Sequence, residues 1–244
     1  MANKSAERAA RTAALLAEQR RSERRHQLTI VAAVVAVLAV VVGIGFWVQS
    51  TRDTTGETAD AVPAGVTSDY GIVVGDESAP TAITVYEDLQ CPVCAQFEAA
   101  TADRLAQAVE AGDVRVDYRL VSFLDEASTN DYSSRALNAA LVVLDTSGVE
   151  TFKEFHDLLF ANQPAEGGPG PEDDQLIHYA VQAGAEEAAI REPIEDKVYE
   201  QWIKNATEQM SKNGVNGTPT VLIDGEQVEG TPQEAIDAVL AATE

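Results

Sequence analysis

Residues 81–94 have the sequence TAITVYEDLQCPVC, in which a short β-rich run leads into two cysteines. Threonine, isoleucine, valine and tyrosine favour extended backbone, so residues 81–86 predict a strand. Pro92 suits the first turn of a helix, where its missing N–H is not needed. Apolar residues recur at helical spacing from Pro92 to Ala111, and Gly112 offers a C-terminal stop. The stretch therefore predicts a strand that runs directly into a helix, with the first cysteine at the junction.

The sequence that follows predicts an α/β domain. Residues 114–120 (VRVDYRL) alternate apolar and polar side chains, the period of a strand with one buried face, and complete a βαβ unit. Several helical patterns then predict an inserted helical subdomain over about 125–213. Residues 220–223 return to strand and turn at Asp224-Gly225, a strong hairpin signal. A final helix begins at Thr231-Pro232-Gln233-Glu234, whose threonine and glutamate suit a capping box.

The net charge of the 244 residues is −23, and it is divided unevenly along the chain. Residues 1–27 carry seven Lys/Arg against three Asp/Glu, so residues 28–244 carry a net −27. A field of this sign repels phosphate backbones and anionic lipid headgroups. We therefore expect no nucleic-acid partner and no peripheral adhesion of the main domain to a membrane surface.

Residues 28–48 form an uncharged apolar segment, LTIVAAVVAVLAVVVGIGFWV. At about 1.5 Å per residue, such a helix spans roughly 30 Å, the thickness of one hydrocarbon core. Four arginines lie just before the segment, so the positive-inside rule predicts a cytoplasmic N-terminus. A cleaved signal peptide is the competing interpretation, but the segment is longer than a usual signal-peptide core and no Ala-x-Ala follows it.

The predicted organisation has four parts. Residues 1–27 form a cytoplasmic segment, residues 28–48 a transmembrane helix, and residues 49–68 a flexible linker of small and polar residues. Residues 69–244 form the globular domain outside the cytoplasm. The predicted location is the cytoplasmic membrane, crossed once.

The chain has two cysteines, Cys91 and Cys94, with two residues between them. A disulfide that closes so short a loop restrains the unfolded chain little, so a purely structural bond is not expected. A helix N-terminus stabilises a thiolate and lowers the pKa of the first thiol below the value of about 8.5 for free cysteine. A sulfur of low pKa is a good leaving group, which favours thiol-disulfide exchange. We expect Cys91 to be the exposed, attacked sulfur and Cys94 the buried, resolving one.

A zinc site and two unreactive core cysteines are the alternative interpretations of this pair. Structural zinc needs four ligands, and the sequence has neither a second cysteine pair nor histidines at ligand spacing. We therefore expect no metal and no cofactor. His156 and His178 lie within helical patterns and are interpreted as packing or surface residues.

A second motif, Gly217-Thr218-Pro219-Thr220, directly precedes the predicted hairpin strand. A proline at the start of a strand is ordinary by itself. In combination with an upstream Cys-x-x-Cys helix, it suggests a cis peptide bond after Thr218 that places Pro219 beside the two sulfurs.

These motifs resemble the DsbA-like branch of the thioredoxin superfamily, in particular its membrane-anchored actinobacterial forms. The resemblance covers residues 70–242. It implies a thioredoxin-like fold with an inserted helical domain, and an enzyme that transfers disulfides to exported proteins with cysteine pairs. It also implies that a membrane reoxidant using quinone restores the disulfide, and that Thr218 and Pro219 bind the substrate strand. The matching segments are Gly75, Ala79-Pro80, Tyr86-Glu87-Asp88, Cys91-Pro92-Val93-Cys94, Gly217-Thr218-Pro219-Thr220 and Asp224-Gly225.

Two positions depart from the pattern of this family. Many relatives hold a buried acid six residues before the first cysteine, where this chain has Val85, so Glu87 and Asp88 are the candidate proton acceptors for Cys94. Strongly oxidising relatives often carry Pro-His between the cysteines. Here Pro92-Val93 tunes the pair without an imidazole, which predicts a weaker oxidant. A reductase or isomerase on the same scaffold and a non-catalytic redox-sensing or binding module are the alternative functions.

Overall fold

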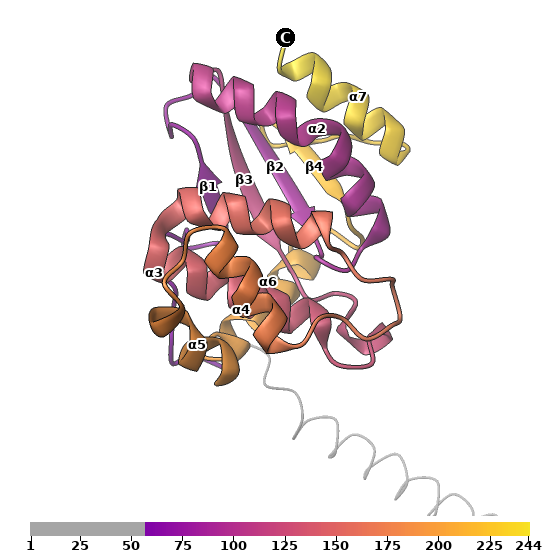
Figure 1. Cartoon of the computed structure of the whole chain (residues 1–244). Helices are drawn as coiled ribbons and strands as arrows, with labels where there is room; N and C mark the ends of the chain where they lie inside the picture. Colours follow the sequence, from indigo (N-terminus) through magenta and orange to yellow (C-terminus); the bar gives the residue numbers. More distant parts are fainter. Residues whose placement is uncertain (1–56) are drawn as a thin grey trace, which may run out of the picture. The chain divides into compact units, whose positions relative to one another are not determined.

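The computed structural model describes residues 57–244 (Figure 1). The predicted cytoplasmic segment (1–27) and transmembrane helix (28–48) therefore lie outside the described residues. Within residues 57–244, no helix combines the length and the apolar character needed to cross a membrane.

A five-stranded mixed sheet with the order β1-β3-β2-β4-β5 carries the domain. The parallel neighbours β2 and β3 are the strands of the predicted βαβ unit, and the other pairs are antiparallel. Val85 in β2 lies opposite Tyr118 of β3 and Val221 of β4, and all three side chains are buried. The strands are β1 (Ile72–Val74), β2 (Thr81–Glu87), β3 (Val114–Leu120), β4 (Thr220–Ile223) and β5 (Glu226–Gln227).

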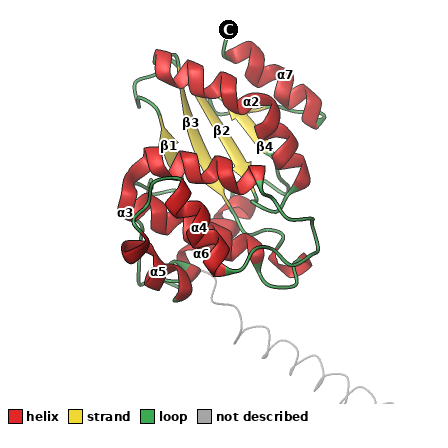
Figure 2. Cartoon of the chain, in the orientation of Figure 1, coloured by secondary structure: helices red, strands yellow, loops and turns green. Residues whose placement is uncertain are grey.

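The helices form two groups, which Figure 2 shows at different parts of the sheet. In the first group, α2 packs against β3 and α7 against β4, and the two helices contact each other. The second group is the inserted subdomain, which lies between β3 and β4 in the sequence. The elements are α2 (Pro92–Ala111), the 3-10 turn η1 (Asp125–Ala127), α3 (Tyr132–Ala161), α4 (Asp173–Gln182), α5 (Glu187–Glu195), α6 (Glu200–Lys212) and α7 (Pro232–Ala242).

The predicted α/β arrangement with inserted helices is confirmed, and so are several of its local signals. α2 begins at Pro92, and Gly112 ends it in the left-handed conformation (φ 80°). Thr231 accepts a hydrogen bond from the backbone N–H of Glu234, whose carboxylate accepts in return from the backbone N–H of Thr231. These signals depend on residues only a few positions apart, which is why they are readable in the sequence.

Helix α3 is 30 residues long and breaks at Gly148, whose backbone (φ 83°, ψ 176°) is not helical. Glycine adopts this conformation without the penalty that a Cβ would bring. Beyond the break, the rings of Phe152 and His156 lie 6.4 and 4.8 Å from the ring of Tyr118 in β3. The second half of α3 therefore brings a histidine of the insertion against the central sheet.

Two parts of the domain differ from the sequence prediction. The first is strand β1, which the sequence pattern does not predict, because three residues are too few to show a period of two. Residues 57–68, expected as the end of the linker, contact the insertion: Ala64 N–H donates to Asp145 Oδ1 at 2.7 Å, and Asn205 Nδ2 donates to the Glu57 carbonyl at 2.9 Å. The globular unit therefore begins before residue 69, because this segment satisfies its polar groups on α3 and α6.

Substitution of a core leucine of α3 should destabilise the whole domain. Leu137 is completely buried, so Leu137→Ala leaves a cavity and should lower the free energy of unfolding by about 2–5 kcal/mol in a urea titration. Val181 is 40% exposed, so Val181→Ala should change it by less than about 0.5 kcal/mol. Similar unfolding midpoints for the two variants would show that the insertion does not share the core.

Candidate active site

Cys91 lies where β2 leads into α2. It is the N-cap residue of the helix, with extended backbone (φ −74°, ψ 116°), and Pro92 takes the first helical position. A hydrogen bond of 2.9 Å from Cys91 N–H to the Asp88 carbonyl closes the turn before it. Cys94 follows one helical turn later, and both residues are free thiols. The backbone N–H groups of Val93 and Cys94, which have no helical partner, face the Cys91 sulfur.

The prediction that Cys91 is exposed is wrong. Cys91 is 5% exposed and Cys94 0%, so Cys91 is only the more accessible of two buried residues. The loop before β4 covers it: Cys91 Sγ lies 3.3 Å from the Thr218 carbonyl oxygen. The peptide bond between Thr218 and Pro219 is cis, as predicted. The sequence motif of the proline loop therefore does lie beside the cysteine pair.

The pKa values of the two thiols are shifted in opposite directions. The pKa of Cys91 falls to about 6, chiefly because the Cys94 thiol donates a hydrogen bond to its sulfur. Burial opposes this shift, and the Thr218 side chain and the backbone N–H groups add to it. The pKa of Cys94 is raised, because its sulfur is buried and its proton is held by Cys91. At neutral pH, Cys91 is a thiolate and Cys94 a thiol.

Glu87 is completely buried at the end of β2 and faces the insertion. Its Oε2 lies 3.1 Å from His156 Nε2. Burial raises the pKa of Glu87 to about 8, although a hydrogen bond with Glu98 and the charge of Lys153 act in the other direction. The charge of Glu87 in turn raises the pKa of Cys94. This carboxylate is therefore close enough to Cys94 to influence its proton.

Asp88, the next residue, is also buried, and both of its carboxylate oxygens accept hydrogen bonds. Its Oδ1 accepts hydrogen bonds from the Gln90 N–H at 2.8 Å and the Ser133 hydroxyl at 2.6 Å, and its Oδ2 accepts from the Leu124 N–H at 2.8 Å. Burial raises the pKa of Asp88 to about 6 against these hydrogen bonds. The arrangement makes Asp88 a connection between the cysteine turn and the insertion.

Two further polar residues of the site, Glu98 and His156, are not among the candidates from the sequence. Glu98 is 3% exposed, and no N–H or hydroxyl donor among residues 57–244 reaches its oxygens. Glu98 and Glu87 lie close enough for each to affect the pKa of the other, and two neighbouring carboxyl groups can share a hydrogen bond only when one of them is protonated. Burial, then the charge of Glu87, raises the pKa of Glu98 to about 8. The detectable signal is a polar residue at helical spacing from buried apolar ones: Glu98 follows Cys94 by four positions in α2, and His156 follows Phe152 by four positions in α3.

Two glutamines hold the cysteine turn against the loop between α3 and α4. Gln163 Nε2 donates to the carbonyl oxygens of Leu89 at 3.1 Å and Cys91 at 3.0 Å. Gln90 Nε2 donates to the carbonyls of Ala165 and Gly168, each at 3.3 Å. The position of Cys91 is therefore set by the insertion as well as by β2 and α2.

A groove of about 240 Å³ lies beside the cysteine pair. Val93, from between the cysteines, forms part of its wall, and Pro92 is exposed next to it. The predicted substrate-binding residues Thr218 and Pro219 line the groove as well. The remaining wall comes from β4, the hairpin to β5 and the start of α7, namely Thr220, Val221, Gln227, Val228, Glu229, Gly230, Thr231, Pro232 and Ala235.

One group of residues in the described chain has the ligand atoms for a cation. Glu98, His156 and Asp157 offer one atom each, all within 4.8 Å of one another. Lys153, however, makes an ion pair with Asp157, and its charge also acts on Glu98. An ammonium group therefore already supplies positive charge here, which disfavours a metal ion.

Removal of the Cys94 thiol should raise the pKa of Cys91. At pH 6, about half of Cys91 is thiolate in the reduced protein, because its pKa is about 6. Cys94→Ala removes the main hydrogen-bond donor, so this fraction should fall several-fold as the pKa moves toward about 8.5. Cys94→Ser keeps an O–H donor and should stay close to the wild type. The pH dependence of alkylation by iodoacetamide measures the three values, and equal values for all three would contradict the role of the hydrogen bond.

Sequence comparisons identify relatives of this domain. A family model described as thioredoxin matches residues 67–242. The serine/threonine-protein kinase PknE of Mycobacterium tuberculosis is 33% identical over 177 residues, 70% of this chain and 31% of the kinase. The Na(+)/H(+) antiporter NhaA 3 of Salinispora tropica is 29% identical over 169 residues, 68% of this chain and 23% of the antiporter. The chain thus spans about a third or less of the length of these curated relatives.

The chain also resembles several solved structures, and the match covers almost the whole length of each of them. The reduced disulfide bond oxidoreductase DsbG of M. tuberculosis matches with a TM-score of 0.60 and 31% identity, over 71% of this chain and 94% of that one. Reduced DsbA of M. tuberculosis matches with a TM-score of 0.59 and 30% identity, over 72% and 100%. MdbA, a thiol-disulfide oxidoreductase from Corynebacterium diphtheriae, matches with a TM-score of 0.60 and 25% identity, over 76% and 100%. The chain therefore belongs to the thioredoxin family, and residues 67–242 form a DsbA-like thiol-disulfide oxidoreductase domain.

Proposed function

We propose that this protein is a disulfide oxidase that acts on exported proteins with cysteine pairs. The observation that carries the proposal is the opposite shift of two thiol pKa values beside a groove: Cys91 is lowered to about 6 and Cys94 is raised. A stable Cys91 thiolate favours the reduced protein over its disulfide, and a disulfide whose reduced form is stabilised is readily donated to substrates.

The reaction proceeds through two thiol-disulfide exchanges. In the oxidised protein, a substrate thiolate attacks Cys91 Sγ, and the bond between Cys91 and Cys94 breaks. A mixed disulfide forms between the substrate and Cys91, while Cys94 leaves with the electron pair and takes up a proton. A second substrate thiolate attacks the substrate sulfur of the mixed disulfide, and Cys91 leaves as a thiolate. Two electrons thereby pass from the substrate dithiol to the cysteine pair.

Glu87 is the proposed proton donor and acceptor for Cys94. It is buried, no N–H or hydroxyl group of residues 57–244 donates to its Oε1, and a pKa raised to about 8 lets it hold or release a proton near neutral pH. Asp88 accepts three hydrogen bonds as a carboxylate, and a proton on it would disrupt them. Of the two acids next to the cysteine turn, Glu87 therefore suits the role better.

The proposed location is outside the cytoplasm. Its support is the apolar segment 28–48 with arginines on its N-terminal side, which predicts one membrane crossing and a cytoplasmic N-terminus. The net charge of −27 on residues 28–244 would keep the domain away from anionic lipid surfaces. A reoxidant linked to membrane quinone would return the cysteine pair to the disulfide.

Refolding of reduced, unfolded RNase tests the activity. The oxidised full chain should form native RNase with transfer of one disulfide per chain, and Cys91→Ala should be inactive. Cys94→Ala should trap mixed disulfides with exported proteins in cells, because the Cys91 thiolate can still attack a substrate disulfide while no Cys94 thiol is present to displace the substrate. An inactive wild type together with a Cys94→Ala variant that traps nothing would favour the redox-sensing or binding module.

The reduction potential separates an oxidase from a reductase or isomerase. Values near −120 mV are found in strong disulfide donors and values near −270 mV in reductases. Without an imidazole at Val93, the expected value is toward the oxidising end but below that of the strongest donors. A potential near −270 mV would instead support the reductase.

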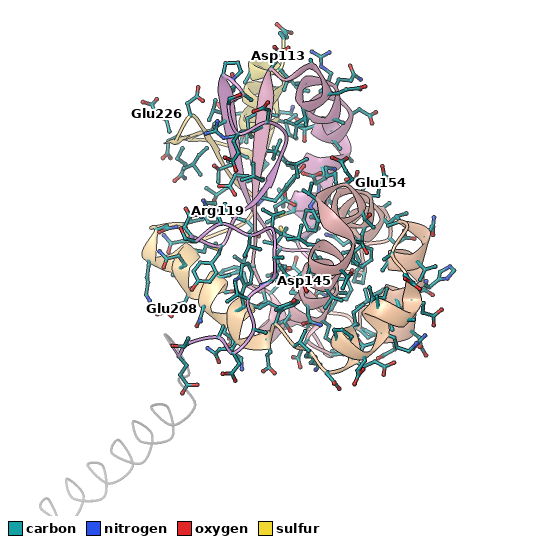
Figure 3. All side chains as sticks on the ribbon, turned by 90° about the vertical axis from the view of Figure 1, so that its left-hand side faces the viewer. Asp113, Arg119, Asp145, Glu154, Glu208 and Glu226 are labelled. Carbon is teal, nitrogen blue, oxygen red and sulfur yellow. The ribbon has the colours of Figure 1, made fainter. Side chains whose placement is uncertain are left out.

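A bulky side chain in the groove should block protein substrates but not small dithiols. Gln227 is exposed and lines the groove, so Gln227→Trp should raise the KM for reduced RNase about tenfold, equivalent to about 1.4 kcal/mol of lost binding. Reaction with dithiothreitol should not change, because it needs only Cys91. Glu226 is exposed on the same hairpin outside the groove (Figure 3), so Glu226→Trp is the matched control. Equal effects of both variants would place substrate binding elsewhere.

A further inference from the structure

A proton must move to or from Cys94 in each exchange, yet the groups around it have no contact with solvent. This inference rests on the proposed function. Cys94, Glu87 and His156 are each 0% exposed, and Glu98 is 3% exposed. A buried acid that takes the proton from Cys94 must pass that proton on before the next turnover. The site therefore needs a route for protons between Glu87 and bulk water.

We infer that His156 and Asp157 of the helical insertion form this route. His156 contacts a carboxylate on each side of its ring: Nε2 lies 3.1 Å from Glu87 Oε2, and Nδ1 lies 3.5 Å from Asp157 Oδ1. The first contact is a normal hydrogen bond, and the second is at the outer limit of one. The Asp157 side chain is 45% exposed, so its carboxylate can exchange protons with water. Buried acid, imidazole and surface acid thus lie in a continuous row.

The imidazole is held in the orientation that the route requires. The rings of Tyr118, Phe160 and Phe152 lie 4.8, 4.9 and 5.9 Å from its own. With aromatic rings against it, the imidazole keeps Nε2 toward Glu87 and Nδ1 toward Asp157. Both ring nitrogens have an acidic neighbour, which is what a proton relay through an imidazole requires.

Each packed element adds titratable or charged groups to this cluster. Glu87 comes from β2, Glu98 from α2 and Tyr118 from β3, and α3 supplies Lys153 and Asp157. Burial raises the pKa of Tyr118, so its hydroxyl keeps its proton at neutral pH. Glu98 and Glu87 each affect the pKa of the other. Lys153 forms an ion pair with Asp157 and holds the outer carboxylate close to the imidazole.

The proton count closes over one catalytic cycle. During substrate oxidation, Cys94 takes a proton from Glu87, and Glu87 takes one from His156 Nε2. Asp157 is ionised at rest, because burial is outweighed by its hydrogen bond with His156 and the charge of Lys153, which lower its pKa, so its carboxylate receives a proton from water and passes it to His156 Nδ1. During reoxidation, Cys94 gives its proton to Glu87, and each transfer runs in reverse. The imidazole starts each half-cycle in the tautomer that the previous one produced. The ring therefore never has to rotate inside its aromatic surroundings.

The test uses the reduced full chain, in detergent, with glutathione disulfide at pH 7. Attack by Cys91 forms a mixed disulfide with glutathione, and Cys94 must then lose its proton to release it. Acid quenching and mass spectrometry follow the two steps separately. His156→Gln and Asp157→Asn should leave the first step unchanged and slow the second about tenfold or more. Glu154 is exposed on the same helix but outside the route (Figure 3), so Glu154→Gln should match the wild type.

Two further readouts separate proton transfer from a structural role. A proton route changes rates in both directions equally, so Asp157→Asn should keep the wild-type reduction potential. Its second step should also accelerate with rising buffer concentration, because buffer replaces the missing carboxylate, whereas the wild type should not respond. A change in the reduction potential of Asp157→Asn that is large enough to explain its slower second step would overturn the inference. A second step as fast as that of the wild type in both His156→Gln and Asp157→Asn would also overturn it.

The same measurements distinguish failure of the inference from failure of the proposed function. Absence of the mixed disulfide in the wild type would contradict the thiol-disulfide exchange itself. A normal mixed disulfide with normal release in His156→Gln would contradict only the proton route. Loss of the second step on treatment with EDTA would also overturn it, because Glu98, His156 and Asp157 would then be holding a metal ion.

Discussion

The hydrogen bond from the Cys94 thiol to the Cys91 sulfur is the interaction on which the site depends. It is the largest cause of the lowered pKa of Cys91, and it leaves Cys94 with a proton that burial alone already favours. The first turn of α2 adds backbone N–H groups on the same side. The strand-to-helix junction therefore holds one sulfur charged and the other neutral, only one helical turn apart.

Because Cys94 is buried, thiol-disulfide exchange at this sulfur requires a proton transfer as well as the transfer of electrons. Desolvation keeps this sulfur uncharged, so every exchange in which it leaves or attacks requires proton transfer in a dry environment. Glu87 and Glu98 come from the two elements that meet at the cysteine turn, and desolvation keeps them partly protonated as well. His156 comes from the insertion and is the next polar group outward. In the proposed cycle, the insertion therefore serves the chemistry as well as the shape of the domain.

Neighbouring acids at the end of β2 have different tasks because the strand ends between them. Asp88 lies in the turn and accepts hydrogen bonds from backbone and hydroxyl donors, which ties the turn to η1 and α3. Glu87 still belongs to the strand and extends into the apolar side of the insertion, where an imidazole is its partner. Gln163 also holds the cysteine turn in place, because its Nε2 donates a hydrogen bond to the carbonyl oxygen of Cys91. The position of the reactive sulfur thus depends on segments far apart in the sequence.

Local physics in the sequence determined the strand and helix around the cysteines, the αL stop at Gly112, the hairpin and the capping box, since each depends on residues a few positions apart. The low pKa of the first thiol follows from the same local geometry. Only the tertiary structure decided the burial of Cys91 and the partner of Glu87. Thr218 approaches Cys91 from 127 residues away, and His156 approaches Glu87 from 69 residues away. Desolvation and proton transfer depend on what packs against a group, and no local pattern in a single sequence records that.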